Sequence, residues 1–351
     1  MKKQVLFVYP NYSTFVKNDY LLLKKRYRVL KKEVKPQKNL FGFVIQQVKL
    51  FFFLLKNILK TNIIFIWFAD YHSFLPALLG KVFSKKVVIV VGGTDAAIVP
   101  EIDYGIFVKR NIRALITKYS LKLSDVILPV HKSLIKGVNY YVDKKGIKIG
   151  FLNFVGSVNA KIVELPTGFD SDKWRRKGVK KENTVLTVAI INDYRTFLLK
   201  GMDIFIDAAR ILEDTNFVII GMSEDFYQKY VEKDKPSNLK VYSYIDNHLL
   251  VNYFAKAKVY CQLSLSEGLP NALCEAMLCE CIPVGSDVNG IPYGIGDTGF
   301  VLKERNVEKA SELIQKALDA DLPQGLKARE YVIKTFSHEK REKILFELLE
   351  R

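Results

Sequence analysis

The chain has 351 residues, of which 49% are hydrophobic and 26% charged, a composition that excludes a disordered protein and allows two domains of ordinary size. Its net charge of +17 is unevenly distributed, because residues 1–165 hold 28 Lys and Arg against 9 Asp and Glu, whereas the remainder holds 26 against 28. The first half is therefore expected to face something anionic, such as a membrane surface, a lipid diphosphate or a nucleic acid. A merely solubilising surface is the alternative.

Ten short runs rich in β-branched and aromatic residues alternate with helical patterns from one end of the chain to the other. Because these runs are apolar on both faces, they predict parallel sheets that helices cover on two sides. Ten strands are too many for one compact sheet of ordinary size, so two sheets are expected. The predicted strands are residues 5–9, 63–68, 86–91, 126–130, 161–165, 185–191, 217–221, 240–244, 259–265 and 282–286.

The polar stretch 166–184, PTGFDSDKWRRKGVKKENT, separates the first five runs from the last five and predicts an inter-domain linker. The predicted fold class is α/β, with two doubly wound, Rossmann-like parallel-sheet domains that face a central cleft. We place the first domain at 1–167 and the second at 168–334. A ligand is expected where the carboxyl ends of the two sets of strands face each other.

Two apolar segments of the first half, 41–60 and 107–122, carry Lys or Arg on part of their surface. In the first, Lys49, Lys56 and Lys60 recur at near-helical spacing. Polar residues interrupt it before the roughly 18 apolar residues of a spanning helix are reached, so it is not expected to cross a bilayer. Either its helix packs on the core with a solvated side, or it attaches the protein peripherally to an anionic membrane. No recognition motif accompanies the charge, so nucleic acid is not an expected partner.

Two features bear on the compartment. The N-terminal run VLFVY is short and strand-like and lacks a cleavage site, so no signal peptide is expected. The cysteines lack a CxxC pair and a nearby His, so buried free thiols are expected rather than a zinc site. Both features predict a cytoplasmic protein, with peripheral attachment at the inner face of the membrane as a further hypothesis. The four cysteines are Cys261, Cys274, Cys279 and Cys281.

The stretch SLSEGLPNALCEAM follows the apolar run 259–265 and contains two glutamates, Glu267 and Glu275. Pro270 is suited to the first turn of a helix, so the strand is expected to lead through a short loop into a helix that begins near Asn271. The free amides of that first turn favour anionic or hydrogen-bond-accepting ligand groups. Both carboxylates are expected to converge on one ligand that offers hydroxyls, for which a vicinal diol is suitable.

The segment EGLPNALCEAM, with its E-x7-E spacing, resembles the signature of the family 4 retaining glycosyltransferases, which have the GT-B fold. The resemblance implies that Glu275 holds the ribose of a sugar nucleotide. It also implies that Glu267 and the loop after it contact the donor sugar. The loop residues assigned to the donor are Gly268, Leu269, Pro270 and Asn271.

The upstream segment YRTFLLKGMD resembles the R-x4-KG-x-D helix entry of the same family. The resemblance implies that Arg195 and Lys200 bind the donor diphosphate, where fixed cations would stabilise the charge that develops on the leaving group. Gly201 is expected to allow a close approach of the backbone to phosphate. The nucleoside base is expected to lie against the backbone near Tyr244 and Ile245.

In the first half, the loop after the first strand places Ser13 and Thr14 at the start of a helix, where they could cap it and offer hydroxyls or amides to phosphate. Asp70 and His72 follow the second predicted strand and are expected in the cleft as acceptor contacts. A structural role is the alternative for His72.

The segment VVIVVGGTDAAIVPEIDYG lies where many family members have a His-Gly-x-Asp element. Gly92 replaces the histidine, while Gly93 and Asp95 remain, and 100–105 matches the P-E-x-x-Y-G continuation of some subfamilies. Asp95 is the leading candidate for a catalytic group on the acceptor side, with a helix N-cap as the alternative. Tyr293 stands where the family commonly has a glutamate.

No metal and no cofactor are expected, because the resemblance assigns the diphosphate charge to Arg195 and Lys200. Asp170 and Asp172 form a D-x-D that mimics the metal motif of a different glycosyltransferase fold, and we discount it. The resemblance to GT-B proteins also predicts that the last helix, 335–351, crosses back onto the first domain.

These observations predict a metal-independent, retaining hexosyltransferase that moves a sugar from a nucleotide diphosphate to an acceptor hydroxyl. The expected acceptor is a glycan or a lipid-linked precursor of a surface polysaccharide or glycoconjugate. One alternative within enzymes is a GT-B sugar-nucleotide epimerase or phosphorylase. The other alternative is a catalytically silent, membrane-associated scaffold that keeps the fold.

Overall fold

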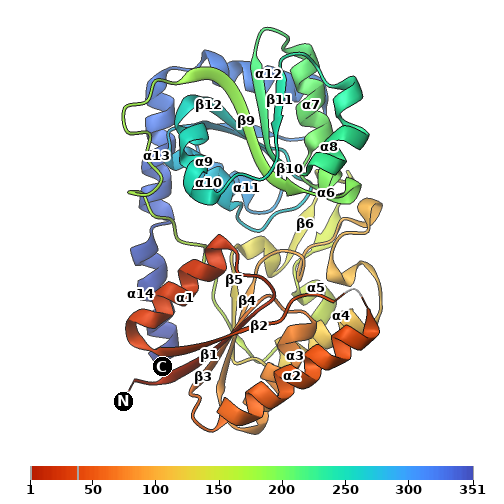
Figure 1. The fold of residues 1–351 in the computed structure, drawn as a ribbon, viewed down its shortest axis with the longest axis vertical. Coiled ribbons are helices and arrows are strands. Elements are labelled where there is room, and N and C mark those ends of the chain that lie inside the picture. The colour runs from red at the N-terminus through yellow and green to blue at the C-terminus, as the bar shows by residue number, and fades with distance from the viewer. Residues whose placement is uncertain (1, 38, 351) are drawn as a thin grey trace.

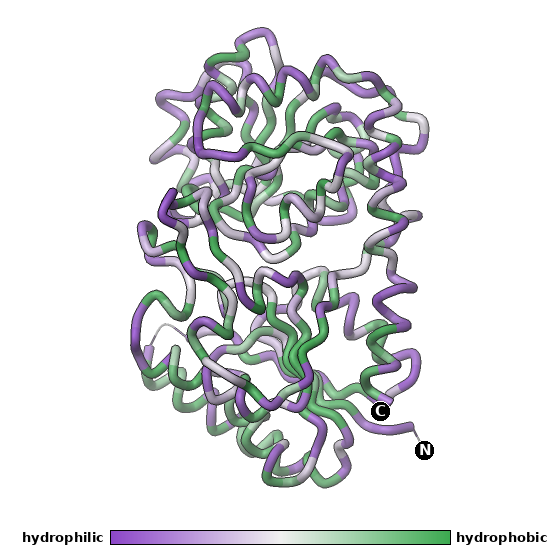
Figure 2. Tube along the Cα trace, turned by 180° about the vertical axis from the view of Figure 1, so that it is seen from behind, coloured by the Kyte–Doolittle hydropathy of each residue, from purple (hydrophilic) through white to green (hydrophobic). Residues whose placement is uncertain are grey.

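The computed structural model describes residues 2–37 and 39–350 and contains two α/β domains stacked along the long axis of the molecule (Figure 1). The first domain is built on a six-stranded, fully parallel sheet with the order β2-β1-β3-β4-β5-β8. Its strands are β1 (Gln4–Tyr9), β2 (Arg28–Glu33), β3 (Ile63–Trp67), β4 (Lys86–Val91), β5 (Val126–Pro129) and β8 (Lys161–Ile162). The four inner strands, β1, β3, β4 and β5, form the apolar centre of the domain (Figure 2).

The second domain has a six-stranded parallel sheet with the order β11-β10-β9-β12-β13-β14. The order reverses direction between β9 and β12, so the carboxyl ends of these strands flank a ligand-binding crevice. The strands are β9 (Glu182–Ile191), β10 (Asn216–Met222), β11 (Leu239–Tyr242), β12 (Ala257–Gln262), β13 (Ile282–Ser286) and β14 (Phe300–Leu302).

Each of the ten predicted runs forms a strand, and the prediction of two doubly wound α/β domains is confirmed. The sequence did not predict β2, β14, or the antiparallel hairpin of β6 (Gly137–Asn139) and β7 (Ile147–Ile149). β2 reads RVLKKE and lies at the edge of its sheet, so it lacks the continuous apolar pattern of the buried strands. The hairpin strands and β14 are only three residues long.

Helices cover both sheets (Figure 1). In the first domain they are α1 (Thr14–Arg26), α2 (Leu40–Ile58), α3 (Tyr71–Val82), α4 (Ile112–Leu123) and α5 (Leu152–Val155). In the second they are α6 (Tyr194–Leu199), α7 (Met202–Ile211), α8 (Glu224–Tyr230), α9 (Asn247–Lys256), α10 (Asn271–Leu278), α11 (Ile291–Ile295), α12 (Val307–Asp319) and α13 (Leu322–Thr335). Short 3-10 turns occupy Pro100–Ile102, Ile106–Val108, Lys132–Leu134 and Glu232–Asp234.

The last helix, α14 (His338–Glu350), leaves the second domain and packs beside α1 of the first (Figure 1). Arg341 of α14 forms a fully buried ion pair with Asp19 of α1, with both nitrogen–oxygen distances at 2.6 Å. Arg341 also donates to the carbonyl oxygens of Leu165 and Pro166, and Trp67 donates to Asp19. A buried charge pair that is satisfied in this way is costly to separate, so α14 fixes the first domain against the linker.

By length and composition alone, α2 is long and apolar enough to cross a membrane, with a mean hydropathy of 1.3. This finding differs from the expectation that the segment is too interrupted to span a bilayer. α2 is the one such helix within the described residues. However, α2 connects β2 to β3, which both pair with β1 in a single sheet. The helix is therefore the crossover of a βαβ unit that lies along the domain, with Leu50, Leu54 and Ile58 buried against it.

Candidate active site

A cavity of about 320 Å³ lies between the domains, where the carboxyl ends of both sheets face each other. The loop after β12 touches the loop after β4 directly, because a Cβ atom on Gly268 would collide with the carbonyl oxygen of Gly92. The cavity wall from the first domain consists of Phe15, Trp67, Phe68, Gly92, Gly93, Thr94, Tyr104 and Val130. Thr167 of the linker and Val188, Lys200, Gln262 and 267–272 of the second domain complete it.

Lys200 and Glu267 form an ion pair in this cavity, with 2.5 Å between Nζ and Oε1. The same carboxylate oxygen accepts from the Ser264 hydroxyl at 3.2 Å and from the Gln262 amide at 3.4 Å. Both charged groups are mostly buried, so their interaction is screened less than it would be on the surface. The cavity thus presents an ammonium and a carboxylate side by side, one suited to phosphate and the other to hydroxyls.

Gly201 has a different role from the expected approach to phosphate. Its backbone is left-handed (φ 67°), and a Cβ atom there would collide with the carbonyl oxygen of Leu263. The amide of Leu265 also donates to the carbonyl of Leu199 at 2.8 Å. Glycine therefore allows the turn between α6 and α7 to dock on the end of β12, and this contact holds Lys200 beside Glu267.

Glu275 lies on α10 and is only 5% exposed, and its carboxylate has no hydrogen-bond partner within the described residues. It lines a second, smaller cavity of about 60 Å³ that shares Phe15 and Asn271 with the wall of the first cavity. Burial raises the pKa of Glu275 to about 7, opposed by the charge of Lys173. The two glutamates thus occupy adjacent compartments, so a ligand that reaches both must be extended.

The amino end of α1 points at these cavities. Ser13 is the N-cap residue, yet its side chain makes no capping bond and its hydroxyl oxygen is buried without a described partner. Thr14 lines the small cavity together with Glu275. The unpaired amides of a first helical turn attract anions, so this end of α1 can receive phosphate oxygens beside the second domain.

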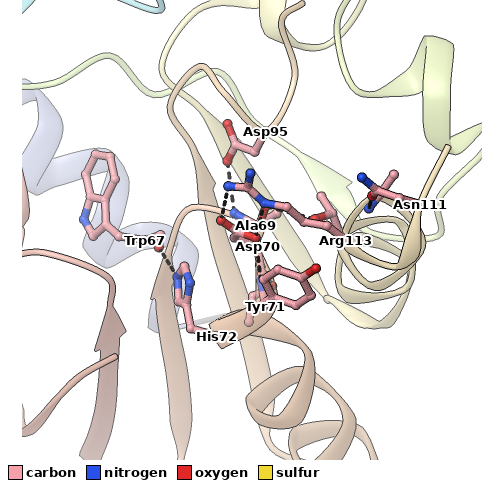
Figure 3. Close-up of polar contacts among 11 residues, drawn as sticks. Trp67, Ala69, Asp70, Tyr71, His72, Asp95, Asn111 and Arg113 are labelled. Carbon is pink, nitrogen blue, oxygen red and sulfur yellow. Dashed lines mark hydrogen bonds and ion pairs between the residues drawn. The ribbon is translucent and has the colours of Figure 1, made fainter. Parts of the chain in front are cut away.

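Asp95 does not face the acceptor side of the cleft, and the expectation that it is catalytic is corrected. It is fully buried, and its oxygens accept from the amides of Gly92 (3.1 Å), Gly93 (2.9 Å) and Ala69 (3.0 Å; Figure 3). Burial raises its pKa to about 6, although these amides oppose the shift. Asp95 therefore braces the loop after β4 and holds Gly92 and Gly93, which line the cavity.

Asp70 and His72 are also structural, and neither lines the cavity (Figure 3). Asp70 caps α3 and accepts two bonds from Arg113, at 2.9 and 2.7 Å. His72 is buried and donates from Nε2 to the carbonyl of Trp67 at 2.8 Å. Burial lowers the pKa of His72, which keeps the ring neutral in this role. Both residues organise the turn between β3 and α3 rather than bind a ligand.

Phe68 is a cavity residue that the sequence did not indicate. It follows β3 with a left-handed backbone (φ 65°), which is costly for a bulky residue and is often found at functional sites. A Cβ atom on Gly92 would collide with the Phe68 ring, so the aromatic ring occupies the space beside this glycine. Phe15 and Trp67 pack on it, with ring centroids 5.9 and 5.5 Å away.

Tyr104 is another cavity residue, and it belongs to the P-E-x-x-Y-G segment noted in the sequence. Burial and the negative charges of Glu267 and Asp95 raise the pKa of Tyr104, while Arg195 opposes the shift. Arg195 lies in the first turn of α6, is exposed, and makes no ion pair in the described part of the chain. Its charge reaches the cavity without its side chain lining the wall.

Tyr244 and Ile245 follow the edge strand β11 and are not brought to either cavity. Tyr244 is 69% exposed. The expected base contact at Tyr244 and Ile245 remains a prediction.

Tyr293 packs against aromatic rings of two other segments. Its ring lies 5.3 Å from that of His131 and 5.1 Å from that of Phe336.

Within residues 2–37 and 39–350, no group of three or more His, Cys, Asp or Glu is arranged to hold a metal ion. The Asp170 carboxylate accepts from the amides of Asp172 and Lys173, which turns the chain at the linker. The four cysteines are buried free thiols, as predicted, and burial raises the pKa of each. Metal independence remains an expectation that rests on the cations Lys200 and Arg195.

Comparison with protein families matches residues 170–335, the second domain, to the family described as glycosyl transferases group 1. A curated relative is a subunit of the phosphatidylinositol N-acetylglucosaminyltransferase from Arabidopsis thaliana, 22% identical over 169 residues. That alignment covers 45% of this chain and 37% of the relative, so the chain spans little more than a third of the relative's length.

Solved structures match the whole chain. Anabaena HepE in complex with UDP has a TM-score of 0.72 at 13% identity, covering 99% of both chains. Sucrose-phosphate synthase from Thermosynechococcus elongatus has a TM-score of 0.72 at 14% identity, covering 99% of this chain and 98% of that one. TarM has a TM-score of 0.67 at 16% identity, covering 87% and 58%. The fold is GT-B.

Proposed function

We propose that this chain, which has the GT-B fold and a second domain matching the glycosyl transferases of group 1, transfers a sugar from a nucleotide diphosphate to an acceptor hydroxyl. The observation that carries the proposal is the inter-domain cavity in which Lys200 and Glu267 meet at the ends of both sheets. A site of this kind can hold a charged leaving group and a polyhydroxylated ring at the same time.

The two adjacent cavities suit an extended donor. Its sugar would lie against Glu267 and the loop 268–270, its ribose diol would donate to Glu275, and its diphosphate would lie between Lys200 and the amino end of α1. HepE has been solved with UDP and with UDP-glucose, which supports a nucleotide sugar as the donor.

The proposed reaction retains the anomeric configuration. The bond between the anomeric carbon and the diphosphate oxygen breaks, the acceptor oxygen attacks from the same face, and the departing phosphate oxygen takes the acceptor proton. Lys200 and Arg195 stabilise the negative charge that builds on the leaving diphosphate, which is electrostatic catalysis by preorganised cations. Glu267 is held by Lys200, and Asp95 is enclosed by backbone amides, so neither is assigned as a nucleophile.

The test is to incubate the purified chain with a panel of nucleotide sugars and to measure release of nucleoside diphosphate. Release, and binding of the nucleoside diphosphate by calorimetry, are expected. The absence of both release and binding would favour the silent scaffold. Conversion of the donor into an epimeric nucleotide sugar without release would favour the epimerase.

We also propose that α2 attaches the protein to an anionic membrane that carries the acceptor. One side of α2 packs on the domain, while an apolar stripe on the other side is exposed, with Phe41 78%, Phe52 64% and Leu59 75% accessible. Exposed apolar surface of this extent marks an interaction site. The α2 stripe consists of Leu40, Phe41, Val44, Ile45, Val48, Phe51, Phe52, Leu55 and Leu59.

Charge supports a membrane as the partner of the α2 stripe. Lys49, Lys56 and Lys60 are exposed on the same helix or just beyond it, and the surplus of Lys and Arg lies in this half of the chain. The Arabidopsis relative carries phosphatidylinositol, a membrane lipid, in its name, which supports a lipid-linked acceptor. Sedimentation with vesicles tests the proposal. Phe41→Ser/Phe52→Ser should lose binding to vesicles containing phosphatidylglycerol, whereas Tyr230→Ser, an exposed aromatic of the second domain, should not.

A further inference from the structure

A further inter-domain cavity, of about 410 Å³, lies beside the donor cavity. His131 and Lys132 after β5 line it from the first domain, together with Lys136, and Asp287 and Lys303 line it from the second. The two cavities adjoin at the loop after β12, because a Cβ atom on Gly290 would touch both the Gly268 carbonyl and the His131 ring. A group bound here would therefore lie next to the loop assigned to the donor sugar.

The charge in this cavity is positive. Lys132 and Lys136 make no ion pair in the described part of the chain, whereas Lys303 pairs with Asp287 at 3.1 Å. The carboxylate of Glu164 also lies near Lys132, but it accepts from the backbone amide of Lys132, at 3.1 Å. Two exposed lysines that line the cavity thus remain for a ligand, and unpaired cations at a concave site favour a phosphate.

His131 supplies a hydrogen-bond donor to the same cavity. It is 4% exposed, and its Nδ1 accepts from the Ser133 hydroxyl at 2.8 Å and from the Ser133 amide at 3.3 Å. The proton therefore resides on Nε2, which has no hydrogen-bond partner within the described residues. Burial lowers the pKa of His131 to about 4, so the ring is a neutral donor at ordinary pH. Because His131 lines the cavity, this N–H is available to a ligand bound there.

We propose that this cavity binds the phosphate of a phosphorylated acceptor, through Lys132, Lys136 and the Nε2 proton of His131. The inference rests on the proposed function, because it places the acceptor hydroxyl next to the donor sugar. The phosphate can belong to a soluble sugar or polyol phosphate or to the head of a lipid, and the same groups recognise both.

The experiment measures binding of sn-glycerol 3-phosphate by calorimetry and binding of phosphatidylcholine vesicles with and without phosphatidic acid by sedimentation. Lys132→Ala/Lys136→Ala should weaken one of these interactions about tenfold. The matched control is Lys144→Ala/Lys145→Ala, which removes the same charge from an exposed turn of the same domain outside the cavity. Binding of UDP should be unchanged in both variants.

A selective effect on glycerol 3-phosphate indicates a soluble acceptor, and a selective effect on phosphatidic acid vesicles indicates a lipid acceptor; either supports the site. Equal effects in the two double variants, or no binding of either probe to the unaltered chain, would overturn it. His131→Phe keeps a ring against Tyr293 but removes the donor, and it should weaken the same probe about threefold to tenfold. Donor turnover is measured separately, so phosphate binding without nucleoside diphosphate release would reject the proposed activity and leave the phosphate site standing.

Discussion

The two sides of the cleft differ in how well the sequence predicted the positions of their residues. On the donor side, Glu267 and the loop after it line one cavity, as expected from their strand–loop–helix segment, and the docking of Gly201 on Leu263 brings Lys200 beside them. On the acceptor side, Asp70, His72 and Asp95 turn inward and hold loops in place. Groups on a short strand–loop–helix unit keep a fixed relation to one another, whereas groups that follow separate strands depend on how each loop packs.

The largest expected effect lies on the donor side. Lys200→Ala should lower turnover by about 10²- to 10³-fold, because it removes a preorganised cation from the leaving diphosphate, while UDP binding falls less. Nucleoside diphosphate release under steady-state conditions measures the first, and calorimetry the second. The control is Lys240→Ala, an exposed lysine on the edge strand β11. Equal turnover in the two variants would show that Lys200 does not stabilise the leaving diphosphate.

Glu275 should couple pH to both stability and binding. Its native pKa is about 7 against an ordinary 4.5, so the native state holds a proton that the unfolded state loses between these values, and stability falls as the pH rises through this window. Glu275→Gln should reduce the decline in the free energy of unfolding between pH 5 and pH 8 by about 2 kcal/mol, measured by denaturant titration. UDP should bind this variant about tenfold more weakly at pH 8, since the carboxylate accepts the ribose hydroxyls.

The same titrations on Glu308→Gln, an exposed glutamate of α12, provide the control. An unchanged pH dependence in Glu275→Gln would show that this carboxylate is not the buried acid of the second domain. An unchanged affinity of Glu275→Gln for UDP would show that Glu275 does not bind the ribose.

On the acceptor side, Asp95→Asn should act on stability more than on chemistry. The asparagine side chain accepts through one oxygen only, so at least one of the backbone N–H groups of Ala69, Gly92 and Gly93 loses its partner, at a cost of about 1 to 2 kcal/mol in the free energy of unfolding. At a temperature where the variant is folded, turnover should stay within about tenfold of the unaltered chain. A loss of turnover comparable to that of Lys200→Ala, without destabilisation, would restore Asp95 as a catalytic group.

The smallest expected effect concerns Phe68 and Gly92. Gly92→His alone should destabilise the chain, because its side chain collides with the Phe68 ring. Phe68→Gly frees that space and relieves the left-handed backbone, so the double variant should recover about 1 kcal/mol relative to the sum of the single changes. Thermal or denaturant unfolding of all four chains measures this coupling. Strictly additive effects would show that the ring and the glycine do not share one space.

The sequence by itself determined the two parallel sheets, since buried strands carry continuous apolar runs that depend on local pattern alone. It also determined the unit from Glu267 to Glu275, where proline and the helix start fix the geometry over a few residues. The remaining features depend on tertiary contacts. The left-handed Phe68, the inward turn of Asp95 and the docking of Gly201 on Leu263 depend on contacts between segments distant in the chain. So does the division of the cleft into adjoining cavities, because their walls come from both domains.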